Sequence, residues 1–180
     1  GCGAQEAGFD AAAIHERAVT LDTHVDIPLD FATAAVDPLD GDLQVNLEKM
    51  KSGGFDAAFF IVYVGQTART PDNYAAARAD ALTKFGAIRR MAETYPDRTA
   101  IAYTPDDVQR TVASGKLVAA IGVENGFSAG TDLAALDEFH ALGARYFGLV
   151  HNGDNDLAHS AQPPAEMADA PGEAPGRTET

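Results

Sequence analysis

Two long apolar runs restrict the fold of this chain more than any other feature. They are "FDAAFFIVYVG", Phe55 to Gly65, and "LVAAIGVENG", Leu117 to Gly126. Neither run shows the polar–apolar alternation of a half-exposed strand, so each is typical of a strand buried on both faces. Strands of this kind occur in sheets covered by helices on their faces. The two runs therefore predict an α/β fold.

Helix patterns separate the strand patterns. Thr70-Pro71 and Thr104-Pro105 each offer an N-cap residue followed by proline at the first helical position. The first of these helices presents one apolar face, formed by Leu82, Phe85, Ile88, Ala92 and Tyr95. Two more amphipathic helices are predicted, one near residues 42–52 and one over 132–143, the latter built on Leu133, Leu136 and Phe139.

Further strands are predicted over residues 18–27, briefly over 99–103, and from 144 to an end at His151. The main strands and their helical crossovers then follow the order βαβαβαβ. Parallel strands need such long crossovers, so the order requires a parallel sheet.

Polar residues stand where the predicted strands end. His24 and Asp26 lie two positions apart, so their side chains point to the same face of the first strand. Glu124 and His151 end two later strands. Taken singly, a histidine here reads as a hydrogen-bonded core residue, and Glu124 before Asn-Gly reads as part of a turn. Three strands that deliver such groups to one rim instead indicate an active site.

The residue types at this rim suit a divalent metal. Imidazole nitrogen and carboxylate oxygen are ligands of zinc, and manganese or iron also accept them. A carboxylate can bridge two metal ions that together ionise a water molecule for hydrolysis. Asp22 is expected to face away from His24 or to hydrogen-bond behind the ligands. His159 in the following loop stays an open candidate, and Asn152, Asp154 and Asn155 are expected to shape that loop.

Charge and composition exclude some partners and suggest a location. The formal charge of −14, from 27 acidic against 13 basic residues, argues against a nucleic-acid partner. No apolar run is long enough to span a membrane. Cys2 in "GCGAQEAG" resembles the acylated cysteine of a bacterial lipoprotein, which predicts a lipid-anchored or periplasmic protein of the cell envelope; a chance cysteine is the alternative. Residues 1–11 would then form a flexible linker.

Three motifs together resemble the membrane (renal-type) dipeptidases of the amidohydrolase superfamily: "DTHVDIP", "LVAAIGVENG" and "GARYFGLVHNGDNDLAHS". The resemblance implies a (β/α)8 barrel of the TIM type, two zinc ions, hydrolysis of dipeptides, often with a D-residue at the carboxyl side, and homodimers. It implies that His24 and Asp26 bind one zinc ion and that Glu124 is a catalytic ligand bridging both. His151 matches the catalytic position that contacts substrate and the tetrahedral intermediate.

The length departs from that family. Eight βα units need about 250 residues, whereas this sequence has 180. We therefore expect residues 12–160 to form the amino-terminal half of such a barrel, and residues 161–180 to be a disordered or truncated tail. His24, Asp26 and Glu124 cannot fill two four-coordinate metals, so the chain alone is expected to be inactive. The alternatives are a non-catalytic half-barrel or another metal-dependent amidohydrolase, such as a deaminase or lactonase.

Overall fold

A parallel sheet forms the centre of the molecule in the computed structural model, which describes residues 10–170 and 172. The central strand β4 pairs with β2, and β2 pairs with β1. On its other edge, β4 pairs with β3 near its start and with β5 near its end. The strands are β1 Leu21–Asp26, β2 Ala57–Tyr63, β3 Thr99–Ile101, β4 Leu117–Glu124 and β5 Ala144–Phe147. The predicted α/β fold with a parallel sheet is confirmed.

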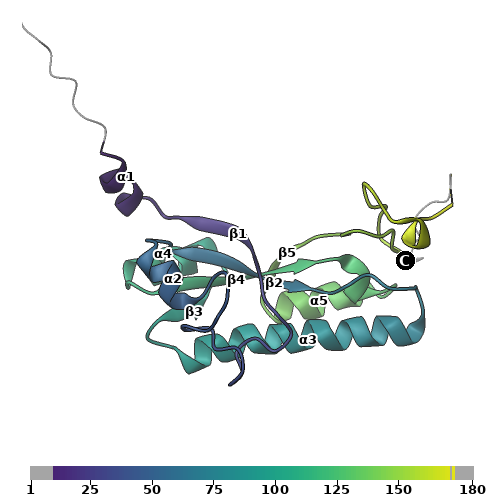
Figure 1. The fold of residues 1–180 in the computed structure, drawn as a ribbon, viewed down its shortest axis with the longest axis horizontal. Coiled ribbons are helices and arrows are strands. Elements are labelled where there is room, and N and C mark those ends of the chain that lie inside the picture. Colours follow the sequence, from purple (N-terminus) through teal and green to yellow (C-terminus); the bar gives the residue numbers. More distant parts are fainter. Residues whose placement is uncertain (1–9, 171, 173–180) are drawn as a thin grey trace, which may run out of the picture.

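The helices begin where the threonine–proline pairs predict. Thr70 accepts a hydrogen bond from the amide of Asn73, and Thr104 forms a capping box with Asp107. Figure 1 shows the long helix α3 running along one side of the sheet, with α5 next to it. The helices are α1 Ala11–Arg17, α2 Leu47–Ser52, α3 Pro71–Thr94, α4 Pro105–Ala113 and α5 Ala134–Ala141, with short 3-10 turns η1 Gly126–Ala129 and η2 Ala165–Met167.

The two faces of the sheet differ in what covers them. Alternate residues of β4 (Leu117, Ala119, Ile121 and Val123) join the main core with Phe85 and Ile88 of α3. The residues between them point to the opposite side, which we call the open face. Its residues come from the four strands β1, β2, β4 and β5 and include Leu21, Phe59, Tyr63, Gly122, Glu124 and Tyr146.

The buried faces of two helices differ from the prediction. On α3, Leu82 is 38% exposed, whereas Lys84 is only 8% exposed. The helix packs closest through the small residues Ala77 and Ala81, which turns Leu82 outward and Lys84 inward. On α5 only Phe139 of the three predicted apolar residues is buried, and Leu133 and Leu136 are exposed.

The last strand is shorter than predicted. It ends at Phe147, so His151 lies in the following loop rather than at the strand end. The chain leaves the sheet because the Leu149 carbonyl accepts hydrogen bonds from the Gly126 amide and the Asn155 side chain instead of a strand partner. Helix α2 is also shorter than the pattern over residues 42–52, because Asn46 caps it at Leu47.

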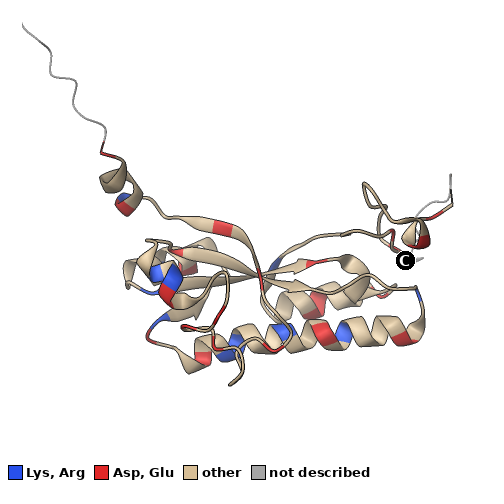
Figure 2. Cartoon of the chain, in the orientation of Figure 1, with Lys and Arg blue, Asp and Glu red and all other residues tan. Residues whose placement is uncertain are grey.

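The predictions for the two ends of the sequence are only partly covered by the described residues. Cys2, the predicted lipidation residue, lies outside the described residues. Residues 161–170 lie along the loop after β5, where the Asp154 amide donates to the Met167 carbonyl at 2.8 Å. No helix within residues 10–170 is long and apolar enough to cross a membrane. Figure 2 shows acidic and basic residues interspersed along α3.

Candidate metal and catalytic site

A bulge in β1 aims its polar residues at the open face. The pairing with β2 shifts between Asp22 and Val25, so one extra residue is inserted there. The Asp22 carboxylate accepts a hydrogen bond from the His24 amide at 2.8 Å, which supplies a partner that the ladder lacks at this point. Val25 turns into the core, while His24 and Asp26 both point to the open face. The shared face predicted for His24 and Asp26 is therefore present, with Asp22 hydrogen-bonding behind them.

Glu124 meets these two residues from the end of β4. It stands level with Tyr63 in the sheet, and its Oε2 lies 3.2 Å from His24 Nε2. His24 Nε2 is also 3.4 Å from Asp26 Oδ1. One ligand atom of each residue lies within 4.8 Å of the others. The three side chains predicted as metal ligands thus converge at the carboxyl end of the sheet.

His151 approaches Glu124 from the other side. Its Nε2 lies 3.7 Å from Glu124 Oε1, the oxygen that does not face His24. Its ring stands edge-on to Tyr63, with the ring centroids 5.0 Å apart. The Ser160 hydroxyl donates to the His151 carbonyl at 2.8 Å, which fixes the backbone of this loop. Although it follows the strand rather than ending it, His151 reaches the same rim.

The donor set fits a divalent metal ion of the zinc class. Ligand atoms that lie about 2.1 Å from a common ion are about 3.0–3.4 Å apart, and His24, Asp26 and Glu124 have separations of 3.2 Å and 3.4 Å. The carboxylates also impose a negative field. Burial, followed by the charges of Glu124 and Asp26, raises the pKa of the Tyr146 hydroxyl to about 12 and also raises the pKa of Tyr63. Such a field attracts cations to this rim.

Several residues around the rim escaped prediction. Asn125 is fully buried with φ at 73°, and its side chain joins the Val64 carbonyl to the Phe127 amide. It also accepts a hydrogen bond from Asn155, which anchors the loop that carries His151. The Asn-Gly pair after Glu124 did indicate a turn here, but it gave no sign that Asn125 would be buried and would anchor this loop. Lys84 offered no such signal, and its amine lies 5.7 Å from the Tyr63 ring centroid.

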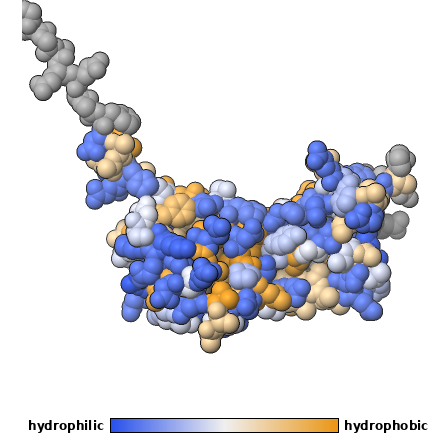
Figure 3. All heavy atoms as spheres, in the orientation of Figure 1, coloured by the Kyte–Doolittle hydropathy of each residue, from blue (hydrophilic) through white to orange (hydrophobic). Residues whose placement is uncertain are grey.

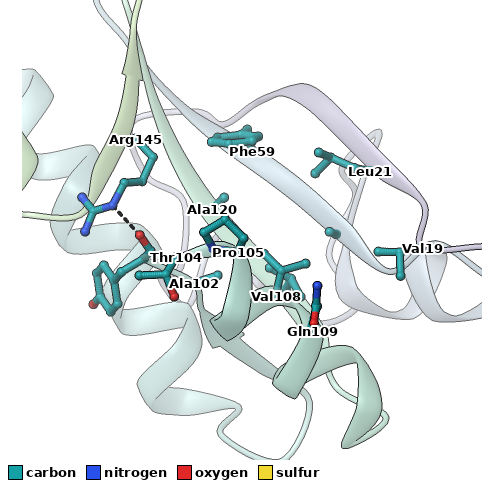
Figure 4. Close-up of a pocket in the computed structure, with 13 residues that line it drawn as sticks. Val19, Leu21, Phe59, Ala102, Thr104, Pro105, Val108, Gln109, Ala120 and Arg145 are labelled. Carbon is teal, nitrogen blue, oxygen red and sulfur yellow. Dashed lines mark hydrogen bonds between the residues drawn. The ribbon is translucent and has the colours of Figure 1, made fainter.

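The opposite end of the open face has a different character. A groove of about 500 Å³ lies between the starts of β1, β2 and β4 and helix α4, and we call it the amino-end groove. Figure 4 shows Leu21 and Phe59 on one side of it and Pro105 and Val108 of α4 on the other. Arg145 borders the groove and donates to the Tyr103 carbonyl at 2.7 Å. Neither group of possible metal ligands among the described residues lies in this groove.

Comparison with solved structures relates this sheet to larger barrels. The probable dipeptidase PvdM from Pseudomonas aeruginosa has a TM-score of 0.78 and 30% identity, covering 84% of this chain and 39% of that chain. A metallo peptidase from Rhodobacter sphaeroides, liganded with a phosphinate mimic of the dipeptide L-Ala-D-Ala, has a TM-score of 0.55 and 27% identity, covering 62% and 37%. The prediction of half of a TIM-type (β/α)8 barrel of the metal-dependent hydrolase kind is confirmed.

Sequence comparison gives the same relationship. Dipeptidase tcpJ from Claviceps purpurea is 32% identical over 121 residues, which are 65% of this chain and 28% of that protein. The matched part thus spans less than a third of that curated relative. The family model described as membrane dipeptidase, peptidase family M19, matches residues 9–178. With almost the whole described sheet and its polar rim inside that match, the chain belongs to the membrane dipeptidase family M19.

Proposed function

We propose that the rim of His24, Asp26 and Glu124 is part of a zinc site that hydrolyses dipeptides. The observation that carries this proposal is the convergence of the three ligand atoms within 4.8 Å at the carboxyl end of the sheet. The family gives the reaction class, since its members named above are dipeptidases and a metallo peptidase. The L-Ala-D-Ala mimic bound by one of them favours dipeptides with a D-residue at the carboxyl side as substrates.

Each residue has a role that follows from its position. His24 and Asp26 hold one zinc ion from β1. Glu124 would hold zinc together with these two residues and would serve as the bridging ligand if a second ion binds; its Oε2 faces His24 and its Oε1 faces His151. When bound, zinc supplies an ionised water as the nucleophile near neutral pH.

His151 has a different task from the ligands. Its Nε2 lies farther from the carboxylate than His24 Nε2 does, at 3.7 Å against 3.2 Å, and its imidazole is 41% exposed. A proton held at Nε2 can be donated to the oxygen of the scissile carbonyl as negative charge develops there. Donors of this kind contribute about 2.7–4 kcal/mol to transition-state stabilisation. We therefore assign His151 to the substrate and the other three residues to metal.

Zinc binding by the 180-residue chain tests the ligand assignment. Replacement His24→Ala or Glu124→Gln should weaken zinc binding at least tenfold, because each removes a charged or nitrogen donor. His151→Ala should change the zinc affinity by no more than about twofold, because His151 is assigned to the substrate and not to the metal. His140→Ala is the matched control, since His140 is exposed on α5 away from the rim. Equal losses in all four variants would refute the assignment.

A chimera tests the reaction. Residues 12–160 of this chain replace the matched segment of the Pseudomonas aeruginosa relative, which supplies the rest of the barrel. We expect turnover of L-Ala-D-Ala that Glu124→Gln lowers by at least a hundredfold, about 2.7 kcal/mol, with folding unchanged. A chimera that binds two zinc ions but hydrolyses only lactones or deaminates bases would favour another amidohydrolase reaction. One that folds without binding zinc would favour a non-catalytic unit.

A further inference from the structure

A second group of ligand atoms lies beyond the rim, in the loop after β5. His159 Nδ1 is 3.3 Å from Asp154 Oδ2 and 3.6 Å from Asp169 Oδ2, and the three atoms fall within 4.8 Å of one another. These separations are close to the roughly 3.0–3.4 Å expected between ligands of one first-row ion. Asp169 comes from the segment after η2, so the group joins two stretches of chain.

Two buried oxygens, one in this group and one beside it, are not hydrogen-bonded. Gln66 Oε1 and Asp169 Oδ2 are buried and accept no hydrogen bond from any described residue. Gln66 is 7% exposed and lines the same cavity of about 240 Å³ as Asp154 and Asp169. Its Nε2 lies 3.4 Å from the carbonyls of Thr67 and Asp154, which identifies the other end of the amide as the oxygen. An unpaired buried acceptor costs about 1–3 kcal/mol, so both oxygens call for a cation or a donor.

The surrounding contacts orient these acceptors. Arg69 pairs with Asp169 Oδ1 at 2.5 Å, which leaves Oδ2 turned toward His159. The amides of Ser160 and Asp169 donate to the two oxygens of Asp154. The hydrogen bond from the Asp169 amide is the main cause that lowers the pKa of Asp154, so this carboxylate is charged near neutral pH. The cavity is lined by three carboxylates, of Asp154, Glu166 and Asp169, against the one guanidinium of Arg69, so it carries a net negative charge.

We propose that Asp154, His159 and Asp169, with the amide oxygen of Gln66, bind one divalent cation separate from the site at His24. One imidazole with three oxygen donors favours Mn²⁺ or Zn²⁺ over Ca²⁺, which prefers oxygen ligands alone. The ion ties the segment after η2 to the loop that starts at His151. Ser160, whose amide donates to Asp154, also donates its hydroxyl to the His151 carbonyl. Occupation of this site therefore steadies the backbone of His151.

Manganese binding followed by electron paramagnetic resonance tests the proposal. The full chain carries His24→Ala and Glu124→Gln, so that the rim no longer competes for the ion and the outcome does not depend on the proposed dipeptidase site. We expect one bound Mn²⁺ per chain in this background. Adding Asp169→Asn should weaken binding at least tenfold. Adding Asp80→Asn, which removes an equal charge from an exposed position of α3 outside the cavity, should leave binding within about twofold.

A further variant keeps the test decisive if Asp169→Asn disturbs the fold. The His159 side chain is 44% exposed, so His159→Ala removes a ligand with little effect on packing. It should also weaken Mn²⁺ binding at least tenfold while the circular dichroism spectrum stays unchanged. The proposal is overturned if the background chain binds neither Mn²⁺ nor Zn²⁺. It is also overturned if Asp80→Asn weakens binding as much as Asp169→Asn, which would indicate diffuse attraction by charge.

Discussion

Alternate residues of the same strands form the two faces of the sheet, and the two faces present different kinds of side chain. The helix-covered face is apolar along its whole length, from Leu117 to Val123 on β4. The open face changes along the strands. It is apolar at the amino-end groove, is crossed by Tyr146 in the middle, and ends in the carboxylate of Glu124. In Figure 3 apolar side chains reach the surface near the middle of the view. One face thus supplies the packed core, and the other carries the candidate metal site at one end.

Neighbouring phenylalanines give the sharpest test of this contrast. Phe60 is 2% exposed in the main core, whereas Phe59 is half-buried on the open face against Tyr146. We expect Phe60→Ala to lower the free energy of unfolding by about 3–5 kcal/mol. Phe59→Ala should cost less than about 2 kcal/mol, mainly from the lost ring contact. Urea unfolding measures both variants.

Equal losses in the two variants would contradict the distinction between the faces. They would mean that another part of the protein, or a second copy, covers the open face as closely as α3 covers the other. The adjacent positions share a strand and a residue type and differ in the face to which they point, so each variant is the other's control.

Sequence patterns predicted the parts of the fold that depend on local physics. The apolar runs identified β2 and β4, and the threonine–proline pairs identified the starts of α3 and α4. The phase of α3 could not be predicted, because it depends on how closely Ala77 and Ala81 approach the sheet. Residue spacing alone therefore made Leu82 a core residue and overlooked Lys84.

The convergence of His24, Asp26 and Glu124 at one rim was predictable, and the structure that supports it was not. Carboxylates and a histidine at strand ends were visible in the sequence, and the ends of parallel strands meet at one edge. The bulge that turns His24 outward was not visible, because it depends on a hydrogen bond from the His24 amide to Asp22. The strand end at Phe147 likewise depends on long-range hydrogen bonds to Leu149. Periodicity carries no information about such contacts.

The middle of the open face offers the next test, with a smaller expected effect. Tyr146 reaches across the sheet to donate to the Thr23 carbonyl at 3.1 Å, and it passes directly over Gly122. A Cβ atom at Gly122 would lie 2.2 Å from the Tyr146 ring. Gly122→Ala should therefore displace the ring and cost about 1–3 kcal/mol of unfolding free energy.

A double-mutant cycle shows whether the ring is the cause. In a Tyr146→Ala background the added methyl group has no ring to meet, so Gly122→Ala should cost less than about 1 kcal/mol there. If Gly122→Ala costs as much unfolding free energy in this background, the strain arises in the strand itself, and Tyr146 does not occupy the middle of the open face.

The smallest effect is expected at the amino-end groove. Leu21 lies there 49% exposed, and an exposed apolar side chain adds little to stability. Leu21→Lys should change the unfolding free energy by no more than about 0.5 kcal/mol. It should also reduce the fluorescence of a dye that binds apolar surfaces, because a charge interrupts the apolar lining. Leu82→Lys on α3, at 38% exposure and outside the groove, is the matched control and should leave dye binding unchanged. If Leu21→Lys lowered the unfolding free energy by more than about 1.5 kcal/mol, the substitution would have buried a charge or emptied a packed site. Such a loss would show that this end of the sheet is covered in solution. The two faces would then differ in the chemistry of their side chains and not in how well they are covered.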